Sequence, residues 1–162
     1  MNNTSETEGT VESEFPTEGR LLGLDYGTKR VGIAISTAEQ NISSPLDNYT
    51  RQSVEQDQKH LQKIITEYQC TGLVVGLPVH MSGDEGQKAK EARRFGDWIS
   101  EFAGIPVRYW DERYSSATAE EFLMNMNISR NKRKAYLDKL AAQIILQSFL
   151  DSPNRDQKPE SF

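Results

Sequence analysis

The sequence predicts an α/β fold in which a five-stranded mixed sheet opens with antiparallel hairpin strands and carries helices on both faces. Two short runs with strand character, Arg20 to Asp25 and Arg30 to Ser36, flank a turn that contains Gly27, which is typical of a β-hairpin. The run Leu73 to Leu77 is wholly apolar, as expected of a central strand covered by helices on each side. Elsewhere apolar residues recur at helical spacing, so helices separate the later strands.

The remaining elements follow from the same periodicities. A third strand is expected around Ser44 to Tyr49, and a fifth at Ile105 to Trp110, after Gly104. The apolar spacing predicts four helices. Their ranges are Val54 to Tyr68, Ala89 to Phe102, Ala117 to Asn125 and Lys134 to Leu150.

The chain of 162 residues has the length of one domain. Residues 1–19 are polar and contain five glutamates but no basic residue, so they are predicted to form a disordered acidic tail. Residues 152–162 are predicted to form a flexible C-terminal tail. The folded domain is therefore placed at residues 20–151.

The net charge of -5 weighs at first against a nucleic-acid partner, because phosphate binding draws on lysine and arginine. The excess of acid lies in the N-terminal tail. Without the five tail glutamates, 19 of the 24 acidic residues remain, against 19 lysines and arginines. The charge of the domain is therefore compatible with nucleic-acid binding.

The single cysteine, Cys70, cannot form an internal disulfide, and no apolar stretch is long enough for a signal sequence or a membrane span. We therefore expect a soluble, cytoplasmic protein with no membrane partner. The sequence leaves open whether it is a monomer or a homodimer.

Carboxylates fall at the ends of two predicted strands. Asp25 ends the first strand, at a kind of position where ligands often bind in α/β sheets, although an aspartate there also stabilises turns. Asp111 and Glu112 follow the fifth strand. The alternative for this pair is structural: Asp111 or Ser116 would cap the next helix, and Glu112 would pair with an arginine.

Asp138 heads a helical column that continues through Ala142, Ile145 and Phe149, which are all apolar. The column predicts that Asp138 faces the sheet. A carboxylate in that position is costly unless it is paired or binds a metal, although a solvated place in the first helical turn is the alternative.

Two acids at strand ends and one on a helix can together bind a hard divalent cation, Mg²⁺ or Mn²⁺, which prefers oxygen ligands and retains waters for a phosphate. The chemistry such a site suits is phosphodiester hydrolysis, because metal ions activate water and stabilise the leaving oxygen. Asp25, Glu112 and Asp138 are therefore the candidate metal ligands and catalytic residues.

Five blocks of sequence, in order along residues 20–151, resemble the YqgF family, also called RuvX. They are Gly23 to Gly32, Val74 to Pro78, Met81 to Gly86, Asp111 to Arg113, and Asp138 to Ala142 running into Ile145 to Gln147. The resemblance implies an RNase H-like fold and nuclease activity on pre-16S rRNA, in a family first described as Holliday-junction resolvases. It also implies that Asp25, Glu112 and Asp138 are the catalytic acids. The sequence departs from the family pattern at His80 to Gly83 and at Ser115 and Ser116, where threonines are usual.

Basic and aromatic residues near the acids are candidate substrate contacts. Arginines and lysines beside two of the acids are expected to hold phosphates, although a run of charge is commonly a solvated surface. Tyrosines in the turns next to the acids are expected to stack on unpaired bases. The candidates are Tyr26, Lys29, Arg30, Arg113, Tyr114, Ser115, Ser116, Arg130, Lys132, Arg133 and Lys134.

Three other functions remain open from the sequence. Branched DNA is an alternative substrate for the same chemistry. The turn Asp25 to Thr28 also resembles the first phosphate motif of actin-like ATPases, but those proteins close two such domains around the nucleotide and this chain has the length of one. A non-catalytic nucleic-acid-binding or ribosome-binding module is the third alternative.

Overall fold

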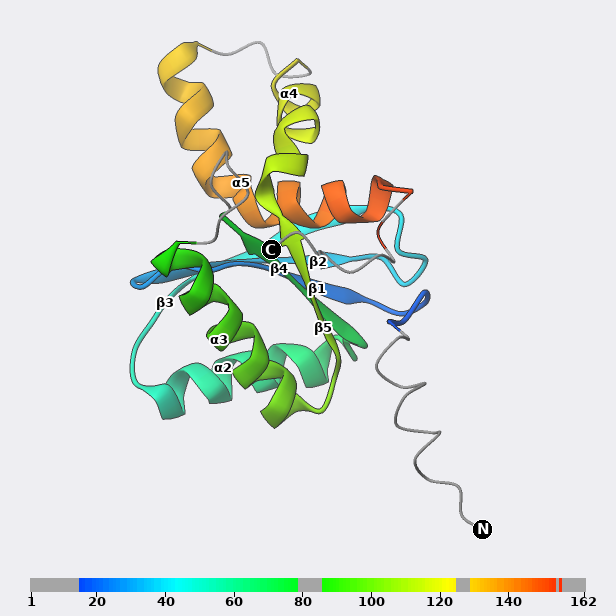
Figure 1. The fold of residues 1–162 in the computed structure, drawn as a ribbon, viewed down its shortest axis with the longest axis vertical. Helices are drawn as coiled ribbons and strands as arrows, with labels where there is room; N and C mark the ends of the chain where they lie inside the picture. The colour runs from blue at the N-terminus through cyan, green and yellow to red at the C-terminus, as the bar shows by residue number, and fades with distance from the viewer. Residues whose placement is uncertain (1–14, 79–85, 125–128, 154, 156–162) are drawn as a thin grey trace.

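The computed structural model describes residues 15–78, 86–124, 129–153 and 155. Within these residues, five strands and four α-helices follow in the order β1-β2-β3-α2-β4-α3-β5-α4-α5, with a short 3₁₀ helix, η1, after the last strand (Figure 1). The strands are β1 (Leu21–Asp25), β2 (Arg30–Ser36), β3 (Ser43–Thr50), β4 (Gly72–Leu77) and β5 (Val107–Asp111). The helices are α2 (Val54–Glu67), α3 (Gln87–Ala103), η1 (Glu112–Ser115), α4 (Ser116–Met124) and α5 (Arg130–Asp151).

The strands form one mixed sheet in the order β3-β2-β1-β4-β5. The pairs β1–β2 and β2–β3 are antiparallel, whereas β1–β4 and β4–β5 are parallel. All six residues of β4 are buried, as its apolar run predicts for a strand covered on both faces. The predicted five-stranded mixed sheet with an opening hairpin is confirmed.

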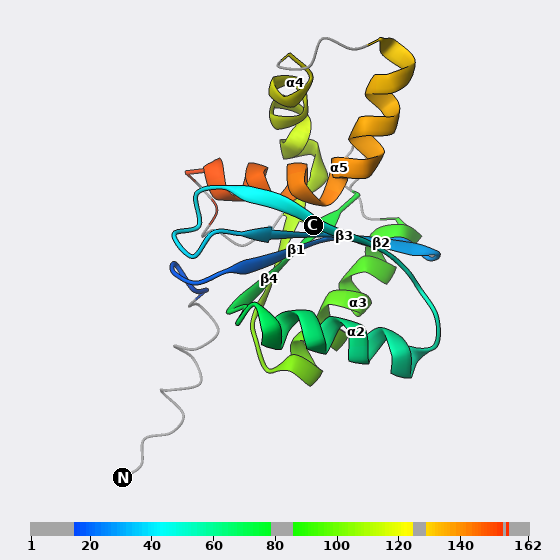
Figure 2. The same ribbon diagram turned by 180° about the vertical axis from the view of Figure 1, so that it is seen from behind.

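Helices cover both faces of the sheet, as predicted (Figures 1 and 2). On one face, α2 and α3 pack on side chains such as Leu22, Leu24 and Val75 to form the larger hydrophobic cluster. On the other face, α5 packs on Leu21 and Val74 to form a second cluster. Because side chains alternate along a strand, consecutive residues contribute to opposite clusters.

Helix α5 has two parts with different surroundings. Its first part stands away from the sheet beside α4, and its second part lies across the sheet (Figure 1). Close approach there depends on glycine: a Cβ placed on Gly23 would lie 2.8 Å from Cβ of Leu146. The helix also starts earlier than the predicted Lys134, because the basic run that begins at Arg130 is already helical. Lysine and arginine are good helix formers, so this run extends the helix.

Both ends of the domain pack against Phe149. The ring of Phe15 meets that of Phe149 edge to face at 5.8 Å, and the guanidinium of Arg155 lies 5.5 Å from the same ring. The buried amide of Gln40 donates to the carbonyl oxygens of Pro16 and Gly19 and accepts from Arg155. Phe15, Pro16 and Arg155 lie outside the range 20–151 predicted for the folded domain, and each contacts a residue within it. Within the described ranges, no helix is long and apolar enough to cross a membrane.

Candidate active site

Asp25 is the last residue of β1, and its side chain lies on the α5 face of the sheet. Its Cβ is 3.5 Å from the point that a Cβ on Gly32 would occupy, and the Cβ of Ala142 on α5 is 3.4 Å from the same point. The absence of a side chain at Gly32 leaves room beside Asp25 for the helix. Asp25 thus lies where β1, β2 and α5 meet.

Glu112 reaches the same face from the end of β5. A Cβ on Gly76 would lie 3.0 Å from Oε2 of Glu112 and 2.7 Å from Cδ1 of Ile145. Gly76 pairs with Trp110 in the parallel ladder, so the carboxylate of Glu112 bends back over β4. The carboxyl ends of the parallel strands β1, β4 and β5 therefore bring Asp25 and Glu112 to one edge of the sheet.

The two acids interact electrostatically. The pKa of Glu112 is raised to about 7, first by burial and then by the negative charges of Asp25 and Asp111, and the positive charge of Lys88 offsets this only in part. A carboxylate with such a pKa lies in a place that lacks compensating positive charge. A divalent cation would supply that charge, so the carboxylate oxygens of these two acids fit a hard divalent metal ion.

Asp111 lies on the other face of the sheet and has a structural role. Its buried carboxylate caps η1 by accepting from the backbone N–H of Arg113 at 2.9 Å. The guanidinium of Arg113 also binds both carboxylate oxygens of Asp111. The capping role that the sequence left open for Asp111 is thus observed. The expected arginine partner pairs with Asp111, whereas Glu112 turns toward Asp25.

Asp138 lies on α5 about one helical turn before Ala142. The helix passes Gly32 at Ala142, Gly76 at Ile145 and Gly23 at Leu146. Its position before Ala142 places Asp138 toward the edge of the sheet that carries Asp25. The side chain of Asp138 lies outside the described residues, and among those described, no three histidine, cysteine or acidic side chains form a metal cluster.

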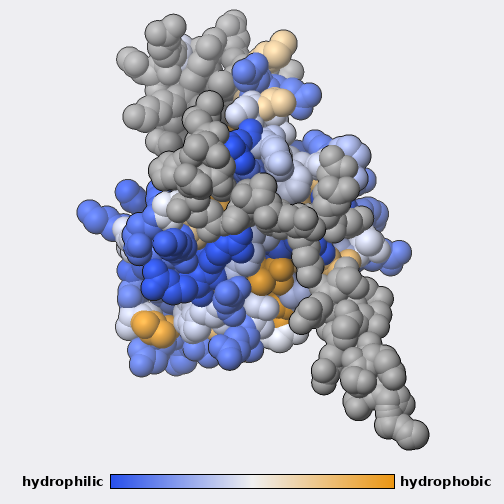
Figure 3. All heavy atoms as spheres, viewed as in Figure 1, coloured by the Kyte–Doolittle hydropathy of each residue, from blue (hydrophilic) through white to orange (hydrophobic). Residues whose placement is uncertain are grey.

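The structure describes the side chains of only some of the predicted basic contacts. Lys29 and Arg30 are exposed at the β1–β2 turn, and Lys132 is exposed on α5. The side chains of Arg130, Arg133 and Lys134 lie outside the described residues, and so does His80, where the sequence departs from the family pattern. Lys88 is not among the predicted contacts, yet it is close enough to Glu112 to affect its pKa. Acidic residues are interspersed with the basic residues of α3, so the sequence did not indicate a basic surface there. Hydrophilic side chains gather over α3 on the face shown in Figure 3.

The two predicted tyrosines differ in their positions. Tyr26 turns to the α2–α3 face, where its ring contacts that of Phe95 at 5.1 Å, so it does not lie beside the acids. Tyr114 is 59% exposed and rests edge to face on Trp110. Ser115 and Ser116 donate to the backbone carbonyls of Glu112 and Arg113, which places both hydroxyls in local turn contacts.

Residues 19–152 match the family model RuvX, described as a Holliday junction resolvase. A relative from Caldanaerobacter subterraneus subsp. tengcongensis, named "Putative pre-16S rRNA nuclease", is 43% identical over 134 residues, which are 82% of this chain and 96% of the relative. A relative of the same name from Rhodopirellula baltica is 37% identical over 146 residues, or 90% of this chain and 84% of its own.

Among solved structures, the chain resembles T. thermophilus RuvC in complex with a Holliday junction substrate, with a TM-score of 0.55 and 14% identity. The likeness covers 81% of this chain and 92% of that one. A second T. thermophilus RuvC structure gives a TM-score of 0.52. At this identity the likeness concerns the fold, which is the RNase H-like α/β fold that the sequence resemblance implied.

Proposed function

The chain belongs to the RuvX family, and on that premise we propose that it is a metal-dependent nuclease that hydrolyses phosphodiester bonds in the 5′-end maturation of pre-16S rRNA. The names of its relatives support the substrate, and the chemistry of the site supports the reaction. In this proposal Asp25, Glu112 and Asp138 are the metal ligands and the catalytic acids.

The observation that carries the proposal is the meeting of Asp25 and Glu112 on the α5 face. Burial and a neighbouring negative charge raise the pKa of Glu112 to about 7, so the folded protein holds this acid at an electrostatic cost. An acid kept for stability alone would be paired, as Asp111 is with Arg113. A strongly perturbed acid at a strand end is typical of a functional site.

Each residue has a defined task in this proposal. Mg²⁺ or Mn²⁺, when bound, lowers the pKa of the attacking water and stabilises the charge of the leaving oxygen. Asp25 at the end of β1 and Glu112 directly after β5 would hold the ion from the two sides of β4, and Asp138 would approach from α5. Lys88 supplies positive charge beside Glu112 and attracts the phosphate that is to be cleaved.

Cleavage of a precursor 16S rRNA fragment in Mg²⁺ and in Mn²⁺ tests this function. Asp25→Asn should abolish cleavage while the protein remains folded, because the amide keeps the shape of the carboxylate but loses its charge. Asp47→Asn is the matched control, since the exposed Asp47 contacts His60 on the α2–α3 side of the sheet. Full activity of Asp25→Asn would show that the proposal is wrong.

Branched DNA is a second candidate substrate, favoured by the description of the family model and by the Holliday junction bound in the similar RuvC structure. The same three acids would serve this reaction. A side-by-side assay of precursor rRNA and four-way junctions, at equal protein and metal concentrations, separates the two substrates. Faster cleavage of the junction would move the proposal from RNA to DNA.

A further inference from the structure

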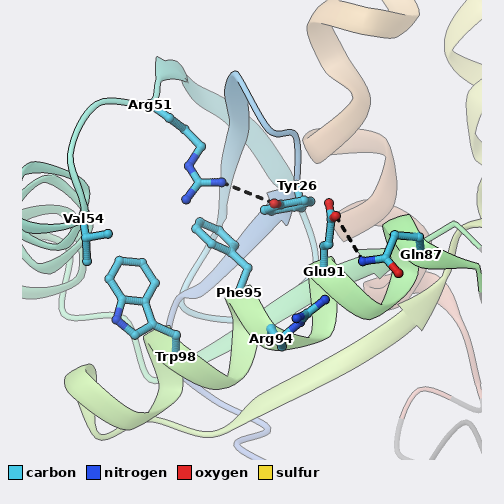
Figure 4. Close-up of a pocket in the computed structure, with 8 residues that line it drawn as sticks. All are labelled: Tyr26, Arg51, Val54, Gln87, Glu91, Arg94, Phe95 and Trp98. Atoms are coloured by element: carbon cyan, nitrogen blue, oxygen red, sulfur yellow. Dashed lines mark hydrogen bonds between the residues drawn. The ribbon is translucent and has the colours of Figure 1, made fainter.

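A pocket of about 580 Å³ lies between the start of α2 and the N-terminal half of α3. Tyr26, Phe95 and Trp98 give it three aromatic rings, and Arg51 and Arg94 give it two guanidinium groups (Figure 4). Val54, Gln87 and Glu91 complete its lining. The pocket combines flat apolar surfaces with positive charge, which is the chemistry that binds a nucleotide.

The aromatic wall of the pocket is held in place before any ligand arrives. Arg51 lies 5.5 Å from the centre of the Tyr26 ring and 5.1 Å from that of Phe95. Its Nε donates to Asp57 at 3.2 Å, and its Nη1 donates to the hydroxyl of Tyr26 at 3.4 Å. A planar ligand can therefore stack here without first ordering these side chains.

Trp98 and Arg94 also line the pocket, and neither side chain is fully buried. The partly exposed indole of Trp98 is braced by the rings of Phe95 at 5.8 Å and Phe102 at 4.9 Å. Arg94 is exposed, and within the described part of the chain it makes no hydrogen bond or ion pair. An aromatic face with an uncommitted guanidinium beside it can receive a base and a phosphate together.

The pocket adjoins the candidate active site around the edge of the sheet. Tyr26 follows Asp25 directly, and the side chains of these two residues lie on opposite faces. Gln87 lines the pocket, and the next residue, Lys88, affects the pKa of Glu112. A strand bound at the acids can therefore pass the N-terminal turn of α3 and place a neighbouring nucleotide in the pocket.

We propose that this pocket binds one unpaired nucleotide of the RNA strand, with its base against Trp98 and Tyr26 and its phosphate on Arg94. This inference deepens the proposed function and rests on it for the identity of the strand. It adds a substrate-positioning site on the face of the sheet opposite the acids. The ligand class is a single-stranded oligonucleotide, bound through stacking and phosphate contact.

Glu91 gives the pocket a preference among bases. Its carboxylate accepts from the amide of Gln87 at 3.3 Å, and Glu91 lines the same pocket as Tyr26 (Figure 4). A carboxylate accepts a hydrogen bond from the amino group of cytosine, whereas uracil presents an acceptor at that position. Oligocytidylate should therefore bind more tightly than oligouridylate, and Glu91→Gln should reduce the difference.

Tryptophan fluorescence, measured in EDTA so that no cleavage occurs, tests the pocket directly. Trp98 is partly exposed in the pocket, whereas Trp110 is buried on the α5 face and donates to Ser148. A short oligocytidylate should quench the emission of the full chain, and Trp98→Phe should remove the quenching. Binding of a labelled oligocytidylate, followed by anisotropy, should weaken by about fivefold or more in Trp98→Leu, which loses the stacking surface.

Arg94→Gln provides a variant that leaves the core unchanged, with Lys63→Gln as its control. Both residues are exposed, and each substitution removes one positive charge. Affinity falls as the salt concentration rises. Loss of one phosphate contact should make the negative slope of log affinity against log salt shallower by about 0.7 for a single strand. Arg94→Gln should show this change and Lys63→Gln should not.

Three results would overturn the inference. They are an unchanged emission of Trp98 on saturation with oligocytidylate, an unchanged salt slope in Arg94→Gln, and binding of free cytidine monophosphate as tight as that of the oligonucleotide. The last would assign the pocket to a free nucleotide. Because no arm scores cleavage, failure of the pocket is distinguishable from failure of the nuclease proposal, which Asp25→Asn tests separately.

Discussion

Acids on the two faces of the sheet have opposite electrostatic surroundings. On the α2–α3 face, Asp57 and Asp111 are almost fully buried, and each is bound by an arginine. On the α5 face, Glu112 lies beside a second acid, Asp25, and its pKa is raised to about 7 by burial first and by that charge next. Adjacent residues in the chain, Asp111 and Glu112, thus belong to opposite electrostatic regimes.

Asp57 shows what a carboxylate committed to stability looks like. Burial alone would raise its pKa, but hydrogen bonds from the backbone N–H of Gln52, the hydroxyl of Tyr49 and the guanidinium of Arg51 outweigh burial, and the net pKa is lowered. The difference teaches that burial does not distinguish a structural acid from a functional one. The charges and donors around the acid do.

The largest expected effect is the loss of cleavage in Glu112→Gln. Removal of outer-shell partners of a metal site costs about 10- to 100-fold in activity, so loss of a ligand should cost at least about 100-fold. The same change should leave the thermal stability of the metal-free protein equal or higher, because it removes repulsion with Asp25. Cleavage of precursor rRNA and thermal melting in EDTA measure the two effects. A clear drop in melting temperature would instead make Glu112 a structural acid.

Asp57→Asn should have the opposite profile, with a large loss of stability and little loss of activity per folded molecule. Breaking a buried ion pair by removing one partner costs about 3–5 kcal/mol, and the amide that remains here retains part of the hydrogen bonding, so about 3 kcal/mol is expected. Urea unfolding measures it. The pKa of Asp57 is lowered, so its stabilising contribution is present above its unfolded pKa and is lost as the pH falls through the folded value. An unchanged unfolding midpoint would show that Asp57 does not stabilise the fold, and the two faces would then not differ in the role of their acids.

Gly76→Ala should affect both regions of the α5 face at once. The added Cβ would lie 2.7 Å from Ile145 and 3.0 Å from the carboxylate of Glu112. Overpacking of a core typically costs about 1–3 kcal/mol, and a displaced Glu112 should also weaken cleavage. Gly104→Ala is a matched control for adding a methyl group, because a Cβ there meets no atom within 4 Å, although its φ of 71° adds backbone strain. Loss of stability without loss of cleavage would show that the added methyl group disturbs the packing of α5 but does not displace Glu112.

Periodicity predicted the fold well because each strand and helix buries one face, and the wholly apolar run at β4 located the centre of the sheet. The same periodicity implies the orientation of Tyr26. Leu24 faces α2 and α3, and the residue two positions further along a strand lies on the same face. What sequence reasoning missed depends on distances between elements. The pairing of Asp57 with Arg51 and Tyr49, and the effect of Lys88 on Glu112, arise only when a loop or a helix is packed on the sheet.

The smallest expected effect, and the most direct measure of the contrast, is the pH dependence of stability. The folded-state pKa of Glu112, about 7, lies above its ordinary value, so the folded protein binds this proton more tightly than the unfolded chain. Stability from this group is therefore full below its unfolded pKa and decreases as the pH rises toward about 7. After discounting for its partial exposure, wild type should lose about 1 kcal/mol relative to Glu112→Gln between about pH 5 and pH 8 in EDTA. Mg²⁺ should restore the lost stability of wild type at the higher pH, because the cation binds the ionised pair. Parallel unfolding curves for the two proteins across this range would mean that Glu112 does not carry the electrostatic cost on which the site depends.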